Sequence, residues 1–139
     1  MHPRREIRTR ARDALREAPR FRRFTFLNAW AQNIDARSLP AIAVATPVER
    51  SRLVSHGTVE RVTTLVVVVK RLGQDGLEDE LDEDEAAIGD ALTGALLTVL
   101  RLIELREVQV SVNGEGAQRV GTLQLTFELT WHWSAPLPS

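Results

Sequence analysis

The residues best suited to hold a metal are three histidines, His2, His56 and His132, and the chain has no cysteine. Transition-metal sites use histidine and cysteine ligands at short, matched spacings. No two of these histidines show the i, i+4 or His-x-His spacing that would bring both imidazoles to one ion. The lack of cysteine also excludes disulfides and thiolate chemistry. We therefore expect no metal site and no cofactor.

Carboxylates are concentrated in residues 75–85, DGLEDELDEDE, a run without a basic residue. A calcium loop would need the order D-x-D-x-D-G and a later glutamate, and this run has neither. Exposed carboxylates of this kind would titrate as ordinary acids. We interpret the run as an acidic loop that leads into a helix, with Asp82 as the N-cap residue and Glu85 at the third helical position.

Glycine-rich turns and serines provide no catalytic motif. The stretches GQDG at 73–76 and NGEG at 113–116 lack the Gly-Lys-Ser/Thr sequence of a phosphate loop. Ser51, Ser55 and Ser111 lack a nucleophile elbow, and the sequence places no base beside them. We therefore expect that the protein is not an enzyme.

Basic residues gather at the N-terminus, where the first 23 residues carry nine arginines and three acids. Clustered arginines can neutralise phosphates, and the neighbouring Phe21, Phe24 and Phe26 could stack on bases. Tyrosine is absent, however, and the phenylalanines fit a core better. A small nucleic-acid-binding module with an arginine-rich N-terminal helix is the alternative function. The charge asymmetry is also compatible with two solvated surfaces or with electrostatic docking between copies.

Two stretches show helical periodicity. Residues 3–18 begin with Pro3, end before Pro19 and place small or aliphatic residues on one narrow stripe: Ile7, Ala11, Leu15 and Ala18. Residues 82 to about 104 carry a second stripe, which predicts one long amphipathic helix that packs on a sheet: Ile88, Leu92, Leu96, Val99 and Ile103.

The longest regular alternation is LQLTFELTWHW, residues 123–133, which predicts a strand with one buried face. Its apolar face, expected to pack on the second helix, carries Leu123, Leu125, Phe127, Leu129, Trp131 and Trp133. Its polar face, expected to meet a neighbour, a tube or a wet lumen, carries Gln124, Thr126, Glu128, Thr130 and His132.

Residues 58–72, TVERVTTLVVVVKRL, predict the longest strand, and its segment Leu65 to Val69 is apolar on both faces. Both faces of that segment should therefore be covered. We expect the second face to be covered by the first helix or by an adjacent subunit.

Three further segments complete the expected sheet. Residues 39–49, LPAIAVATPVE, predict an edge strand between Pro40 and Pro47. Residues 21–35 are ambiguous, with Phe24 and Phe26 in a possible extended segment that leads to Trp30. Alternation at 108–112 followed by Asn113-Gly114 predicts a hairpin with the final strand: Val108, Val110 and Val112.

The resulting order is helix, two or three strands, helix and two strands. It predicts one α+β domain over residues 1–139, with a mostly antiparallel mixed sheet of about four to five strands packed by one long helix. Residues 1–20 contain the basic N-terminal helix, and residues 134–139 form a loose tail. The longest apolar run, LVVVV at 65–69, is far shorter than the ~20 residues of a membrane span. No secretory signal is expected, because no apolar stretch follows the first arginines.

The order of these segments resembles the tail-terminator family of long-tailed bacteriophages and gene transfer agents, the minor tail protein U type. The resemblance spans nearly the whole chain and rests on five stretches in sequence order: REIRTRARDAL, LPAIAVAT, RVTTLVVVVKRLG, LEDELDEDEAAIGDAL and GTLQLTFELTW. Members of this family form a hexameric ring that caps the tail tube, stops its polymerisation and joins the tail to the head.

The resemblance implies a virion structural protein of the tail or neck, assembled in the host cytoplasm, without catalytic residues. Its implied partners are further copies of itself in a homohexameric ring, the tail tube protein and a head-completion protein. DNA would pass through the lumen without sequence-specific binding, and no membrane is involved. Candidate residues for contacts between subunits or with the tube are Arg4, Arg5, Arg8, Arg12, Glu78, Asp79, Glu80, Glu83, Gln124, Thr126, Glu128, Thr130 and His132.

Overall fold

The computed structural model describes residues 2–27, 36–73, 75–100, 102–114 and 119–134. The elements in chain order are helix α1 (Pro3–Glu17), 3-10 helix η1 (Pro19–Phe21), strand β1 (Thr25–Leu27), 3-10 helix η2 (Ala36–Ser38), strands β2 (Ala41–Ser55) and β3 (Thr58–Gly73), helix α2 (Leu77–Leu96), and strands β4 (Leu102–Asn113) and β5 (Arg119–Ser134).

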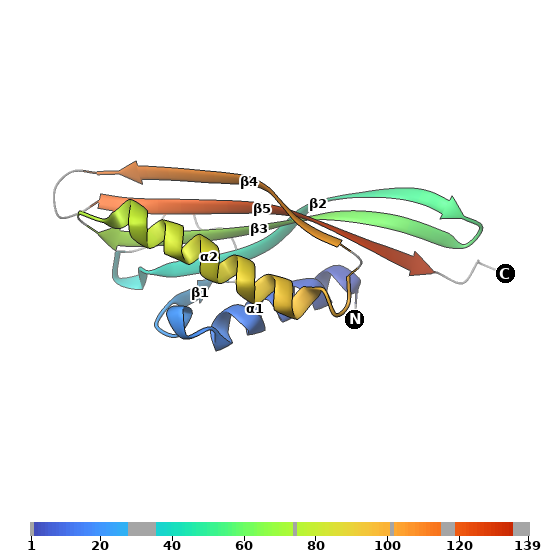
Figure 1. Ribbon diagram of the computed structural model, residues 1–139, viewed down its shortest axis with the longest axis horizontal. Coiled ribbons are helices and arrows are strands. Elements are labelled where there is room, and N and C mark those ends of the chain that lie inside the picture. The colour runs from blue at the N-terminus through green and yellow to red at the C-terminus, as the bar shows by residue number, and fades with distance from the viewer. Residues whose placement is uncertain (1, 28–35, 74, 101, 115–118, 135–139) are drawn as a thin grey trace.

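The five strands form one sheet in the order β1-β2-β3-β5-β4. Only the short pairing of β1 with β2 is parallel, and the other three pairings are antiparallel. Figure 1 shows α1 and α2 side by side on one face of this sheet. This arrangement confirms the predicted α+β class, with an N-terminal helix and one later helix over a mostly antiparallel sheet.

The core lies between the two helices and the sheet. Helix α1 contributes its predicted stripe, Ile7, Ala11 and Leu15. Helix α2 contributes Leu77, Leu81, Ile88, Leu92 and Leu96. The buried face of β5 carries Leu123, Leu125, Phe127, Leu129 and Trp131, as its alternation predicts, whereas the side chain of Trp133 lies outside the described residues.

The predicted start of the second helix is wrong by about one and a half turns. Helix α2 begins at Leu77, after Gly76 in a left-handed conformation with φ of 83°, so Asp82 is not the N-cap residue. The expected acidic loop is therefore helical, and Glu78, Asp79 and Glu80 lie in the first turn. Acids are favoured there because the N-terminal end of the helix dipole is positive.

The predicted end of this helix is also wrong. Helix α2 stops at Leu96, Val99 is 44% exposed, and Ile103 packs on the core from strand β4 rather than from a helix. The segment that begins at Leu102 fits a period of 3.6 and a period of 2 about equally well. Pairing with β5 from Leu102 to Asn113 selects the strand. The predicted pairing of this segment with the final strand is confirmed, but Asn113 pairs with Val120 at the end of β4 and does not form the predicted turn with Gly114, whose φ is 99°.

Strand β2 continues well beyond the predicted segment. A bulge between Ala45 and Val48 accommodates Pro47, and the strand then runs to Ser55. Among the described residues, β1 pairs with Ala41 to Ala43, and no strand pairs with the other side of β2 beyond Ala43. Within the described residues, Pro47 thus lies at an edge of the sheet, as predicted, where its missing amide donor is tolerated.

The doubly apolar segment of β3 points Leu65, Val67 and Val69 toward the helices and Val66 and Val68 toward the other face. Helix α1 packs beside α2, so the expectation that it covers the second face is wrong. Val66 and Val68 are only 6% and 5% exposed. Their flanking neighbours in the sheet are Ala43 and Ala45 from β2 and Gln124 and Thr126 from β5.

The sheet has two unlike halves. Both helices cover the half that contains β1, the first part of β2 and the second part of β3 (Figure 1). The other half, here called the hairpin end, consists of residues 50–62 of the β2–β3 hairpin with the last residues of β5. It extends past both helices as a single layer (Figure 1), and its turn contains Gly57 at a φ of 82°.

Candidate interaction surfaces

The described residues bring together no group of three or more His, Asp or Glu side chains able to hold a metal ion. The three histidines belong to different elements of the fold. The His2 Nδ1 accepts a hydrogen bond from the backbone N–H of Arg4 and so caps α1, whereas His56 is exposed in the hairpin turn. His132 Nε2 lies 3.4 Å from a carboxylate oxygen of Glu60.

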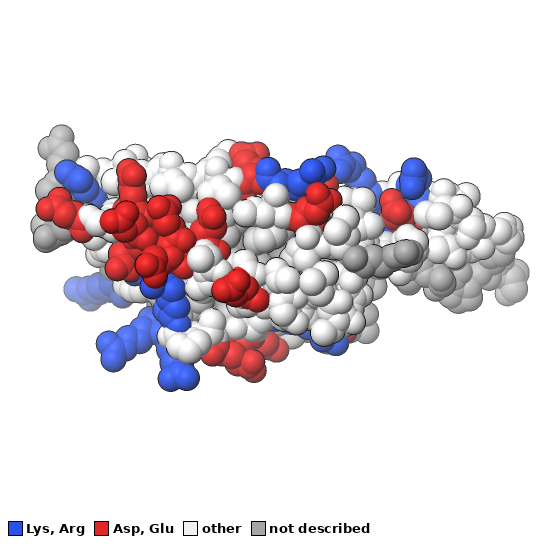
Figure 2. Space-filling view, in the orientation of Figure 1, with Lys and Arg blue, Asp and Glu red and all other residues white. Residues whose placement is uncertain are grey.

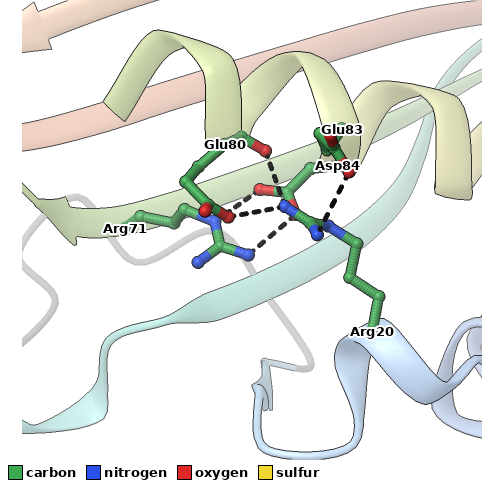
Figure 3. A network of polar contacts seen from close by, with 5 residues as sticks. All are labelled: Arg20, Arg71, Glu80, Glu83 and Asp84. Atoms are coloured by element: carbon green, nitrogen blue, oxygen red, sulfur yellow. Dashed lines mark hydrogen bonds and ion pairs between the residues drawn. The ribbon is translucent and has the colours of Figure 1, made fainter. Parts of the chain in front are cut away.

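One buried carboxylate, Asp84 of α2, accepts hydrogen bonds from two arginines (Figure 3). Arg71 of β3 donates from Nε at 2.6 Å and from its second terminal nitrogen at 2.8 Å. Arg20 of η1 donates from Nε at 2.7 Å and also reaches the backbone and side-chain oxygens of Glu80. Figure 3 shows the two guanidinium groups converging on α2 from different elements, with Glu83 beside Arg20.

This cluster is structural in character. Burial by itself would lower the pKa of Arg20, but hydrogen bonds and charge from Asp84 and Glu80 outweigh burial and raise the pKa. The Arg71 guanidinium also lies over the Phe24 ring, 4.9 Å from its centroid. Both oxygens of Asp84 are occupied by donors, so the cluster ties η1, β3 and α2 together.

Asp84 was not predicted as a buried residue, although the sequence contains a signal for it. Its position lies on the buried stripe of α2 between Leu81 and Ile88. An acid within an apolar stripe indicates a buried, paired carboxylate, since an unpaired one would be costly. Which arginines would pair with it could not be read from the sequence, because Arg20 and Arg71 lie 64 and 13 residues away.

A second network joins the start of α1 to the sheet around Glu49. This carboxylate accepts from Arg4 at 2.6 Å, from Arg61 at 2.5 Å and from the Thr63 hydroxyl at 2.8 Å. Trp131 Nε1 donates to the same hydroxyl at 2.8 Å. Burial would raise the pKa of Glu49, but the three hydrogen bonds and the charge of Arg4 together hold the pKa below its ordinary value.

The candidate arginines of α1 lie over strand β2. Arg8 donates to the Thr46 hydroxyl at 2.7 Å, and Arg12 donates to the carbonyl oxygen of Val44. Burial lowers the pKa of Arg12, and the neighbouring Arg8 and Arg16 lower it further. Arg5 is exposed. The basic surface of α1 therefore borders the β2 edge of the sheet.

The candidate acids of α2 divide between two sides of the helix. Glu80 and Glu83 lie toward Arg20, at 2.8 and 3.8 Å. Glu78 and Asp79 line a hollow that also contains Val112 of β4 and Arg119 of β5. Figure 2 shows acidic side chains gathered over the first half of α2. Among the ion pairs of the described residues, Glu80 and Glu83 contact Arg20, whereas Arg4 contacts Glu49 of β2.

The predicted polar face of β5 lies on the side of the sheet opposite the two helices. Glu128 contacts Arg50 at 3.3 Å and Arg106 at 3.2 Å, so it links β5 to strands on both sides. The face is partly exposed along its length at Gln124, Thr126, Glu128, Thr130 and His132.

Strand β4 is the most exposed apolar element. Every residue from Glu104 to Asn113 is exposed, and only Ile103 is half-buried. Its exposed apolar side chains are Leu102, Leu105, Val108, Val110 and Val112. The last four lie opposite Phe127, Leu125, Leu123 and Gly121, so they continue the helix-side face of the sheet beyond α2.

The hairpin end also exposes apolar side chains, above all Leu53 at 71%. At its base, a hollow of about 220 Å³ lies between α1, the segment after α2 and β5. Its walls include Ile7, Leu100 and Trp131. Apolar surface is thus concentrated along β4 and at the hairpin end.

Comparison with protein-family models finds no match to this chain. Comparison with curated protein sequences likewise finds no match. In the part of the chain that the structure describes, neither helix is long and apolar enough to cross a membrane.

Proposed function

We propose that the protein is a virion structural protein, a ring-forming tail terminator that caps the tail tube, stops tube polymerisation and joins the tail to head-completion proteins. Its partners are further copies of the chain, the tube protein and a head-completion protein. DNA passes through the ring without sequence-specific binding. It acts in the tail or neck of a virion after assembly in the host cytoplasm, and no catalytic step is required.

The observation that supports this proposal most strongly is the apolar surface of the sheet that is exposed to solvent in a single copy. Strand β4 exposes apolar side chains along its length, and the hairpin end extends as a single layer with Leu53 exposed. Exposed apolar surface of this extent is typical of interfaces. A subunit of a ring needs such surfaces on two sides, because each copy contacts two neighbours.

The order of elements also supports the proposal. The five stretches that carry the resemblance correspond in order to α1, the start of β2, β3, α2 and β5. The buried carboxylate of Asp84 has both oxygens bonded to arginines. These features suit a scaffold whose role is to bind other proteins.

The nucleic-acid alternative has less support. Stacking would need exposed aromatic rings, yet Phe21 is fully buried and Phe24 and Phe26 pack on the core. Arg4, Arg8 and Arg12 donate hydrogen bonds to residues of β2. A phosphate would have to compete with these intramolecular contacts.

The test is the mass of the protein in solution over series of protein and salt concentration. We expect a closed ring near six times 15.6 kDa. High salt should loosen it only in part, since apolar contacts resist screening. Binding to duplex DNA is measured alongside at two salt concentrations. A species that remains monomeric or dimeric and binds DNA in a salt-sensitive manner would favour the alternative.

A further inference from the structure

The sheet ends in two different open edges. Strand β4 forms one edge, and in the described residues it pairs only with β5. Strand β2 forms the other edge beyond Ala43, where its described pairing with β1 ends. Each open edge presents backbone N–H and C=O groups that can pair with another strand.

The edge of β4 has a bulge and charged residues near Arg106, but its second half, from Val108 to Asn113, is regular and uncharged. It spans 12 residues and contains neither proline nor lysine. Val108, Val110 and Val112 alternate with Gln109 and Ser111, so one face is apolar. A long edge strand of this kind is a template for strand addition.

We propose that β4 pairs antiparallel with the open β2 edge of a second copy, head to tail, so that the sheet continues from copy to copy. The inference rests on the ring of the proposed function and names the surface on which neighbouring copies meet. Strand directions alternate from β2 through β3 and β5 to β4. A copy added in the same orientation therefore pairs antiparallel.

The register between β4 and the β2 strand of the next copy follows from the charges of the facing side chains and from the side of the sheet on which they lie. Glu104 and Glu107 lie on the face of the sheet away from the helices, opposite Glu128 and Thr126. Arg50 and Arg52 lie on the same face, and their side chains are 70% and 75% exposed. With Glu107 opposite Arg50, the bulge at Arg106 brings Glu104 opposite Arg52.

The same register matches the faces that bear the helices. It places Ile103 of one copy opposite Leu53 of the next, and Leu53 is the most exposed large apolar side chain of the described residues. Opposite charges and apolar pairs across an antiparallel ladder both stabilise it. One alignment therefore pairs opposite charges on one face of the sheet and apolar side chains on the other.

Pairing of β4 with β4, or of β2 with β2, is disfavoured by the charged helices that lie beside these edges. Two β4 edges would bring together the α2 flanks that carry Glu78 and Asp79 beside Val112. Two β2 edges would bring together the arginines of α1, which lie over β2. Head-to-tail pairing instead places basic α1 of one copy near acidic α2 of the next. Such a heterologous contact produces a ring when the rotation closes.

Cysteine cross-linking tests the register, because the chain has no native cysteine. Val48 and Gln109 lie on the same face and become direct opposites in this alignment. Within one copy they are separated by β3 and β5, roughly 14 Å at the spacing of neighbouring strands, which is too far for a disulfide. The variant with both Val48→Cys and Gln109→Cys should form, on oxidation, a covalent ladder up to the size of the ring.

The single variants are the matched controls. Val48→Cys alone and Gln109→Cys alone should give no cross-linked species. Covalent dimers from Gln109→Cys alone would show β4 pairing with β4 and would overturn the head-to-tail arrangement.

Charge reversal gives an independent test in full-length chains. One variant carries Glu104→Arg and Glu107→Arg, and the other carries Arg50→Glu and Arg52→Glu. Each alone should lose the ring at concentrations at which the unmodified chain assembles, because like charges then meet at every contact. An equimolar mixture should regain the ring with the two variants in alternate positions. The arginines on β4 of one variant then face the glutamates on β2 of the other, and the glutamates on β4 of the second face the arginines on β2 of the first.

The outcomes separate this interface from the proposed function. If the unmodified chain forms a ring but the double-cysteine variant yields no ladder and the reversed variants assemble normally, the interface is wrong and the ring proposal stands. If the mixture recovers only a dimer, the contact is isologous and the inference fails. A chain that stays monomeric at every concentration overturns both.

Discussion

The helix-covered half and the hairpin end both contain parts of strands β2 and β3. The hairpin end exposes apolar side chains, whereas the helix-covered half buries them. Under the helices, Leu65, Val67 and Val69 are fully buried, whereas at the hairpin end Leu53 is 71% exposed. The strands are continuous through both halves, so strand propensity does not explain the contrast. The difference arises from the helices, which supply a second layer to only one half. We infer that the covered half provides folding stability and that the hairpin end and β4 provide association.

The largest loss of stability is expected from Asp84→Ala. This change leaves Arg20 and Arg71 without the carboxylate that both contact, and breaking a buried ion pair costs about 3–5 kcal/mol. Chemical denaturation monitored by circular dichroism measures the loss. Asp90→Ala, at an exposed acid of the same helix, is the control and should change stability by less than about 0.5 kcal/mol. Equal losses from the two changes would show that the buried ion pairs of Asp84 do not stabilise the fold.

Leu96→Ala should follow, with a loss of about 2–5 kcal/mol from the cavity left in the core. Leu53→Ala is its matched control at the hairpin end. Because Leu53 is exposed in one copy, its truncation should change the stability of the monomer by no more than about 0.5 kcal/mol. Thermal unfolding of both variants at low protein concentration makes the comparison. A large loss from Leu53→Ala would contradict the division between the halves.

Glu49→Gln probes the junction between the halves, where Arg4 and Arg61 meet one carboxylate. Its charged hydrogen bonds should contribute about 1.5–3 kcal/mol at neutral pH. The folded-state pKa of Glu49 lies below its ordinary value. Its contribution is therefore present above the unfolded-state pKa and is lost as pH falls through the lowered folded-state pKa.

Unfolding measured from neutral to acidic pH tests this dependence. The unmodified chain should lose stability toward acid, and Glu49→Gln should lose less over the same range. Curves that stay parallel would show that Glu49 does not titrate with folding.

The sequence predicted those elements whose apolar residues repeat with the period of a helix or of a strand, but not of both. The stripe of Ile7, Ala11 and Leu15 could only suit a helix, and the alternation from Leu123 to Trp131 could only suit a strand. The ends of α2 were not predictable in this way. Leu102 and Ile103 fit both periods, and only the free energy of pairing with β5 favours the strand. The charged residues of both helices can be read from the sequence, whereas the exposed apolar side chains of β4 were not predicted.

The α+β class, the stripe of α1, the part of the α2 stripe from Ile88 to Leu96 and the alternating faces of β5 could be read from the sequence, because they follow from side-chain periodicity along one segment. Tertiary structure alone decided that both helices share one face and that Arg20 and Arg71 bind Asp84. It also decided that, among the described strands, β4 and most of β2 lie at the edges of the sheet. These features depend on how segments far apart in the chain pair and pack, and no local pattern carries that information.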